Sequence, residues 1–114
     1  MGLALSESQQ QIAVVEYCDA RGIPCAHIPN EGKRNKYAGA QLKRQGLRKG
    51  FPDLVIPVAR GEYHSLYIEM KDYGGKPTKE QVEWIHKLRA QGMCAFVCIG
   101  ARNAIELIER YMAM

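Results

Sequence analysis

Three ionisable residues in the middle of the chain have the types and spacing of a hydrolytic site. Asp53 follows a proline in GFPDLVIP (Gly50 to Pro57), and Glu69 and Lys71 stand one residue apart in LYIEMK (Leu66 to Lys71). Both stretches otherwise have the apolar composition of core strands, where an unpaired charge is costly to bury. The positions of these charges therefore call for a chemical explanation.

Strand geometry brings these side chains together. Side chains alternate along a strand, so Tyr67, Glu69 and Lys71 share one face, with Glu69 and Lys71 about 7 Å apart. If Asp53 begins an adjacent hairpin strand in matching register, its carboxylate converges on that of Glu69. Two carboxylates about 4 Å apart repel by about 4 kcal/mol at a near-surface dielectric, and a divalent cation removes this repulsion.

Mg²⁺ or Mn²⁺ fits such a pair, because these ions favour oxygen ligands and accept one or two carboxylates together with phosphate oxygens. A bound ion of this kind lowers the pKa of a water ligand and neutralises charge on an attacked phosphate. Lys71 could then orient or deprotonate the water, or stabilise the developing negative charge. The pattern indicates a metal-dependent nuclease.

A simpler interpretation stands beside this one. Asp53 could merely begin a strand, and Glu69 with Lys71 could form an exposed ion pair worth less than about 1 kcal/mol. The tripeptide E-x-K and the dipeptide PD are both common. Spacing alone does not decide between the two interpretations.

The remaining pattern predicts elements that position these residues. We expect helices over residues 6–20, within 37–45, from 78 and over 101–112, and strands over 53–58, 65–71 and 93–100, with an edge strand or extended segment in 23–29. The short 59–64 connection favours an antiparallel hairpin, and the later strand–helix–strand order favours a right-handed crossover to a parallel neighbour. The expected fold class is α/β, a mixed β-sheet flanked by helices.

Two capping boxes mark helix starts, Ser6 with Gln9 and Thr78 with Gln81. We expect apolar faces on three helices, and these consist of Val14, Cys18, Val15 and Ile12 on the first, Trp84, Ile85 and Leu88 on the third, and Ile105, Leu107, Ile108 and Tyr111 on the last. Glu7 and Gln11 border the first of these stripes, whereas Glu16 lies on the opposite side of that helix.

Composition restricts the functional class. The 114 residues fit a single domain, 1–114, and no apolar run approaches the roughly 18 residues of a membrane span. Without a recognisable signal peptide, we expect a cytoplasmic protein. The net charge is +4, and residues 33–49 hold seven basic residues without an acid, which favours a polyanionic partner over a plain solvated loop.

The four cysteines are Cys18, Cys25, Cys94 and Cys98, and none forms a C-x-x-C pair. Each lies in an apolar segment, so we expect buried thiols. A zinc-dependent interaction domain is disfavoured by this spacing.

These residues and their context resemble a known family. Pro52-Asp53 followed by Glu69-Met70-Lys71 resembles the PD-(D/E)xK nuclease motif, and the surrounding segments resemble the virus-type replication-repair nuclease domain, VRR-NUC. The segments that carry the resemblance are HIPNEGKR (27–34), GLRKGFPDLVIP (46–57), LYIEMK (66–71), GKPTKEQVEW (75–84) and the last strand and helix. The implied fold is the restriction-endonuclease-like core.

The resemblance implies specific roles. Asp53 and Glu69 would be metal ligands, the Met70 backbone carbonyl a third, and Lys71 the catalytic lysine. The family also places an acid on the first helix, for which Glu7 and Glu16 compete; helical geometry favours Glu7, on the stripe facing the sheet. Gln81 is either a site residue or only the helix cap.

The resemblance also implies partners and a setting, a bacterial or phage-infected host cell. The expected activity is Mg²⁺- or Mn²⁺-dependent cleavage of DNA, selective for branched forms such as four-way (Holliday) junctions in replication, repair or recombination, by a homodimer. The alternatives are a non-catalytic nucleic-acid-binding module on the nuclease fold and an RNA-directed or restriction-type enzyme, although 114 residues leave no room for a separate recognition domain. The candidate phosphate-contacting residues are His27, Asn30, Lys33, Arg34, Arg44, Arg48 and Lys49.

Overall fold

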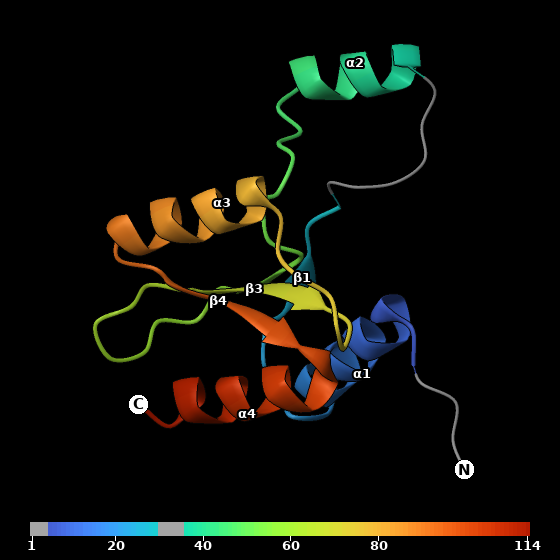
Figure 1. The fold of residues 1–114 in the computed structure, drawn as a ribbon. Helices are drawn as coiled ribbons and strands as arrows, with labels where there is room; N and C mark the ends of the chain where they lie inside the picture. The colour runs from blue at the N-terminus through green and yellow to red at the C-terminus, as the bar shows by residue number, and fades with distance from the viewer. Residues whose placement is uncertain (1–4, 30–35) are drawn as a thin grey trace.

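The computed structural model describes residues 5–29 and 36–114. Figure 1 shows the arrangement of the elements. In chain order they are α1 (Glu7–Ala20), β1 (Ala26–His27), α2 (Lys36–Arg44), β2 (Leu54–Ile56), β3 (Leu66–Lys71), α3 (Lys79–Ala90), β4 (Cys94–Ile99) and α4 (Gly100–Met112). Among the described residues, no helix is long and apolar enough to cross a membrane.

The four strands form one mixed sheet in the order β1-β2-β3-β4. β1 pairs antiparallel with β2 and β2 antiparallel with β3, whereas β3 and β4 are parallel and connected through α3. The predicted hairpin and parallel neighbour are thus confirmed, although β2 is shorter than the stretch expected for it. The segment predicted as an edge strand contributes only the two residues of β1.

The helices divide between the two faces of this sheet. α1 and α4 pack on one face and α3 lies on the other, while α2 stands apart from the sheet (Figure 1). The main hydrophobic core lies on the α1 and α4 face, where Leu66, Ile68 and Met70 of β3 are fully buried. The opposite face of β3 carries Tyr67, Glu69 and Lys71, as the alternation predicts. This face therefore holds polar and charged side chains.

Most predicted core positions are confirmed, including Val14, Cys18, Ile108 and Tyr111. The prediction for Ile12 is wrong, because its side chain is 52% exposed. Gln10, by contrast, is buried. The Gln10 Oε1 accepts a 2.7 Å hydrogen bond from the Ala101 amide.

A physical reason for the burial of Gln10 lies at the start of α4. The residue before this helix is Ile99, which offers no side-chain cap, so the first amides of α4 need an acceptor from elsewhere. Gln10 supplies one from α1. Buried polar groups in proteins normally have a hydrogen-bond partner, and this bond supplies one for the Gln10 side chain. Ile12 is exposed because, at about 100° per residue, it lies roughly 160° around the helix from Val14.

The prediction for α3 is partly wrong. Ile85 is buried as expected, but Trp84 and Leu88 are only partly buried. The Trp84 ring packs edge-on against Phe51, with centroids 4.9 Å apart. A loop residue distant in sequence therefore packs against the indole.

Candidate metal centre

The hairpin register sets Asp53 opposite Glu69. Leu54 pairs with Ile68, and one step further along the same antiparallel register the next two residues are Asp53 and Glu69. Directly opposed residues project to the same face with Cβ atoms about 4.5–5.5 Å apart. The matching register that the sequence required is the one that the hairpin adopts.

Glu7 joins these two acids from the first turn of α1. One carboxylate oxygen from each of Glu7, Asp53 and Glu69 lies within 4.8 Å of the others. The capping box of Ser6 and Gln9 starts the helix at Glu7, which fixes where this side chain projects. Glu16, the competing candidate on the same helix, is exposed to solvent and does not belong to the cluster.

The Asp53 carboxylate is held in place by the neighbouring strand. Its Oδ2 accepts a 2.8 Å hydrogen bond from the Met70 amide. The N–H and C=O of one strand residue point to the same side of the strand, so the Met70 carbonyl points toward the Asp53 side of β3. This geometry is compatible with the backbone ligand that the sequence resemblance implies.

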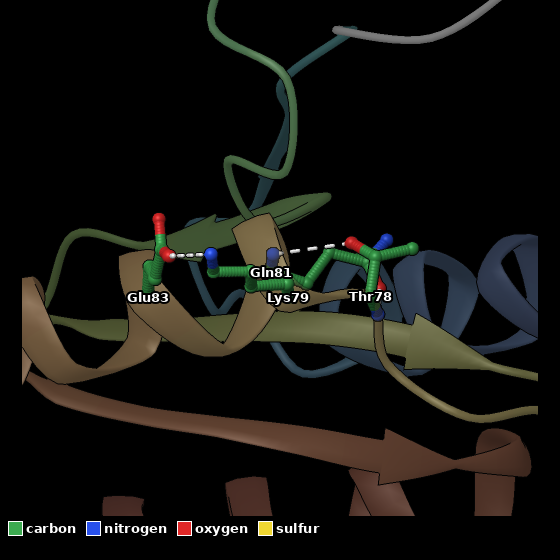
Figure 2. Close-up of polar contacts among 4 residues, drawn as sticks. All are labelled: Thr78, Lys79, Gln81 and Glu83. Carbon is green, nitrogen blue, oxygen red and sulfur yellow. Dashed lines mark hydrogen bonds and ion pairs between the residues drawn. The ribbon is translucent and has the colours of Figure 1, made fainter.

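Gln81 combines two roles that the sequence left as alternatives. Its backbone amide donates to Thr78 Oγ1 (Figure 2). Its side-chain Oε1 accepts from the Thr78 backbone amide, and the two bonds complete a capping box for α3. At the same time, its Nε2 donates to Glu69 Oε2 over 3.2 Å. Both side chains are 2% exposed. The side-chain amide of Gln81 therefore caps the helix through its oxygen and contacts Glu69 through its nitrogen.

Lys71 lies two residues beyond Glu69 on the same face of β3 and is partly exposed. Its alkyl chain passes near Gly75, where an added Cβ would lie 3.7 Å from Lys71 Cδ. A cation on this face, next to the acids, suits contact with a negatively charged substrate.

The loop that leads into Asp53 is locked against α3. Gly50 has a φ of +88°, and an added Cβ would lie 2.6 Å from the Glu80 carbonyl carbon and 2.7 Å from the Gln81 amide nitrogen. Only glycine fits both the backbone conformation and this contact. The approach couples the position of Asp53 to the helix that carries Gln81.

His27 borders the cluster from β1. Its Nδ1 lies 2.9 Å from the Asp53 backbone oxygen and 3.0 Å from Gln11 Nε2. No role was predicted for Gln11, and the only sequence signal for one is its place beside Glu7 on the border of the helical stripe. His27 is exposed, as a phosphate-contacting residue would be.

The remaining basic candidates lie further out. Arg44, Arg48 and Lys49 are exposed, and Arg48 Nη1 donates to the Lys43 carbonyl oxygen over 3.1 Å. Two hollows lie side by side here, one lined by Lys43, Arg48 and Lys49 and the other largely apolar, and both include Leu47 and Arg48. Three further candidates, Asn30, Lys33 and Arg34, lie outside the described residues.

The donor set fits a hard divalent cation. All three carboxylates offer oxygen, which is the ligand type that Mg²⁺ and Mn²⁺ prefer. At an effective dielectric of about 20, two charges about 4.8 Å apart repel by roughly 3 kcal/mol. Because Glu69 is also almost fully buried, a bound cation would relieve both the repulsion and the cost of burial.

The cysteines contribute no ligand to this centre. All four are free thiols, three buried and Cys25 partly so. Burial raises the pKa of the Cys25 and Cys98 thiols to about 12. These groups therefore stay protonated at neutral pH, as buried apolar side chains do.

Comparison with known proteins shows which family and which fold the chain matches. The sequence profile of a family described as "VRR-NUC domain" matches residues 5–102. A solved structure described as a VRR_NUC domain protein is 33% identical, with a TM-score of 0.84 over 97% of this chain and 91% of that chain. A second, described as a VRR_NUC domain, is 25% identical, with a TM-score of 0.63 over 92% of this chain and 96% of that chain. No curated protein matches the chain.

Proposed function

The chain belongs to the VRR-NUC domain family of nucleases, and from that premise we propose that it is a deoxyribonuclease that hydrolyses phosphodiester bonds with Mg²⁺ or Mn²⁺. The observation that carries the proposal is the convergence of Glu7, Asp53 and Glu69 within 4.8 Å beside a lysine on the same strand face.

The three carboxylates and the Met70 carbonyl would hold the ion. When bound, a divalent cation supplies a water of lowered pKa and a positive charge against the phosphate under attack. Asp53 is oriented for this role by the Met70 amide, and Glu69 by the Gln81 side chain. Hydrogen-bonded partners of this kind fix the direction of ligands and are worth roughly 10- to 100-fold in affinity or activity.

Lys71 is the proposed catalytic lysine. Its ammonium group would bind a non-bridging oxygen of the scissile phosphate and stabilise the charge that grows in the transition state. His27, Arg44, Arg48 and Lys49, together with Asn30, Lys33 and Arg34, would contact neighbouring phosphates. Such contacts position the DNA without reading its sequence.

We extend the proposal to branched DNA and a homodimer. Two copies of one site related by a two-fold axis match the symmetry of a four-way junction, in which two strands must be cut. Light scattering at micromolar concentration tests this part separately, and a monomeric mass would contradict it while leaving the chemistry intact.

The experiment that tests the proposed function is cleavage of labelled four-way junction, flap and linear duplex DNA in Mg²⁺ or Mn²⁺. Asp53→Ala and Lys71→Ala should each lower the cleavage rate by roughly 100-fold or more, because one removes an ion ligand and the other a transition-state charge. Glu16→Ala is the matched control, since this acid lies on the same helix as Glu7 but is exposed and outside the cluster. Binding without cutting by the unaltered chain would favour a non-catalytic module.

A further inference from the structure

An apolar pocket of about 250 Å³ lies beside the acidic cluster. Its walls are Ile28, Pro29, Leu47, Phe51 and Trp84, with the Arg48 side chain also lining it. The pocket is smaller than the roughly 300–1,000 Å³ of sites for drug-sized ligands. Its size and aromatic walls suit one flat ring system rather than a folded peptide segment.

The pocket is continuous with the proposed site along three elements. Phe51 lies two residues before Asp53, and its ring meets the Tyr67 ring with centroids 5.8 Å apart. Tyr67 is two residues before Glu69 on the same face of β3, about 7 Å away. Trp84 lies three residues after Gln81, hence on the same side of α3. Pocket residues and acids are thus near neighbours along the same loop, strand and helix, which brings the pocket within reach of DNA bound at the acids.

The charges at its rim favour a nucleotide as occupant. Arg48 also lines the neighbouring basic hollow of about 280 Å³, which holds Lys43 and Lys49. The Lys87 ammonium lies 4.7 Å from the centroid of the Trp84 ring. An apolar aromatic pocket that adjoins a basic hollow complements the two halves of a nucleotide, its base and its phosphate.

We propose that this pocket binds an unstacked nucleobase by stacking on the Trp84 ring, with Phe51 against the edge of the base, while Arg48, Lys43 and Lys49 hold the adjacent phosphates. A fully paired duplex offers no such base, whereas flaps and gaps do. The pocket would therefore select DNA with unpaired bases next to the scissile phosphate. This inference rests on the proposed function in one respect, that DNA is the substrate.

Trp84 itself reports on the occupant, because it is the only tryptophan of the chain. The test titrates the full-length protein, in EDTA and low salt to prevent cleavage, with a short oligothymidylate and with an abasic strand of equal length. Both strands carry the same phosphates. Oligothymidylate should quench the tryptophan emission, whereas the abasic strand should leave it unchanged.

Labelled forms of the same strands measure affinity. Stacking on an aromatic side chain is worth about fivefold to 150-fold in binding per base, so the base-containing strand should bind more tightly by at least about fivefold. Trp84→Leu should remove this ratio, and Trp84→Phe should retain most of it. Thermal melting of both variants checks that α3 remains folded.

Phe96→Leu is the matched control, because Phe96 is also a partly exposed aromatic with a cation over its ring, that of Arg89, but lies on β4 outside the pocket. This variant should keep the full ratio. Equal affinity for both strands would overturn the inference, and so would an emission that changes with protein concentration alone, since a second copy would then cover the pocket.

The outcome is separable from that of the proposed function. Metal-dependent cleavage by the unaltered protein without any preference for bases over abasic residues would overturn this inference and leave the nuclease proposal standing. A base preference without cleavage in Mg²⁺ or Mn²⁺ would support the pocket and overturn the catalytic proposal.

Discussion

Gln81 links the local structure of a helix to the chemistry of the proposed site. One end of its side-chain amide accepts from the Thr78 backbone and the other donates to Glu69. A glutamate at this position would also complete a capping box but would bring a fourth carboxylate to the cluster. The amide caps the helix and donates a hydrogen bond to a metal-ligand candidate without adding charge.

The two roles can be separated by substitution. Gln81→Leu removes the hydrogen bond to Glu69 and one half of the cap, so we expect the cleavage rate to fall roughly 10- to 100-fold together with a loss of stability. Thr78→Ala removes the other half of the cap and should cost about 1 kcal/mol of stability while the cleavage rate changes little. Urea unfolding and cleavage assays on both variants measure the two effects, and equal losses of activity would refute a separate role at Glu69.

At the scale of elements, the loop before β2 and the start of α3 are fitted to each other at Gly50. Asp53 follows this glycine by three residues, and Gln81 belongs to the backbone that Gly50 touches. Displacing α3 would therefore move Gln81 away from Glu69. The precision of the site depends on a contact between two backbones.

Gly50→Ala tests this contact. The new Cβ would meet the α3 backbone at 2.6–2.7 Å in a residue whose φ is +88°, so we expect a loss of about 2 kcal/mol or more in unfolding free energy and a drop in cleavage. Gly46→Ala is the control, since Gly46 has a φ of +108° with nothing within 4 Å of the added Cβ. If both variants lose equal stability and Gly50→Ala cleaves normally, the contact does not position the site.

Much of this arrangement could be predicted from local patterns. The capping boxes at Ser6 and Thr78 fixed two helix starts, and the short 59–64 connection predicted the hairpin that sets Asp53 opposite Glu69. Each of these signals lies within a few residues of the feature that it determines, which is why one sequence was sufficient.

Other features depend on contacts between distant segments. Ile12 was assigned to the apolar stripe, but at about 100° per residue it lies roughly 160° around the helix from Val14, on the side away from the core. The burial of Gln10 could not be predicted, because it depends on the need of α4 for an acceptor, which Gln10 meets across 91 positions of sequence. Trp84 was expected on the core face of α3, but it is only partly buried and packs edge-on against a loop residue, Phe51. Periodicity identifies an apolar face but not its partner.

In the molecule as a whole, the two faces of the sheet carry different kinds of residue. The α1 and α4 face holds the fully buried core residues, whereas the α3 face holds Glu69, Lys71 and the aromatic pocket. A charged site can be tolerated on one face because the other buries a continuous apolar layer.

Cys98 in the core makes stability depend on pH in a definite direction. Burial raises the pKa of its thiol from 9.0 to about 12, so the unfolded chain loses this proton at lower pH than the folded one. The stabilisation is complete below about pH 9 and declines as the pH rises toward 12, by at most roughly 1.4 kcal/mol per pH unit. Urea unfolding from pH 8 to 10 should show a steeper decline for the unaltered protein than for Cys98→Ala, and equal slopes would contradict the assignment.

We propose that Glu7, Asp53 and Glu69 together hold a divalent cation. Calorimetric titration with Mn²⁺ in the absence of DNA measures the affinity for this ion. Asp53→Asn preserves the acceptor for the Met70 amide and removes one charge, and Glu16→Gln removes one charge outside the cluster. We expect Mn²⁺ to bind the unaltered protein and Glu16→Gln equally and Asp53→Asn at least about tenfold more weakly. Equal Mn²⁺ affinity in all three proteins would contradict the proposal that Asp53 and its neighbouring acids hold the ion.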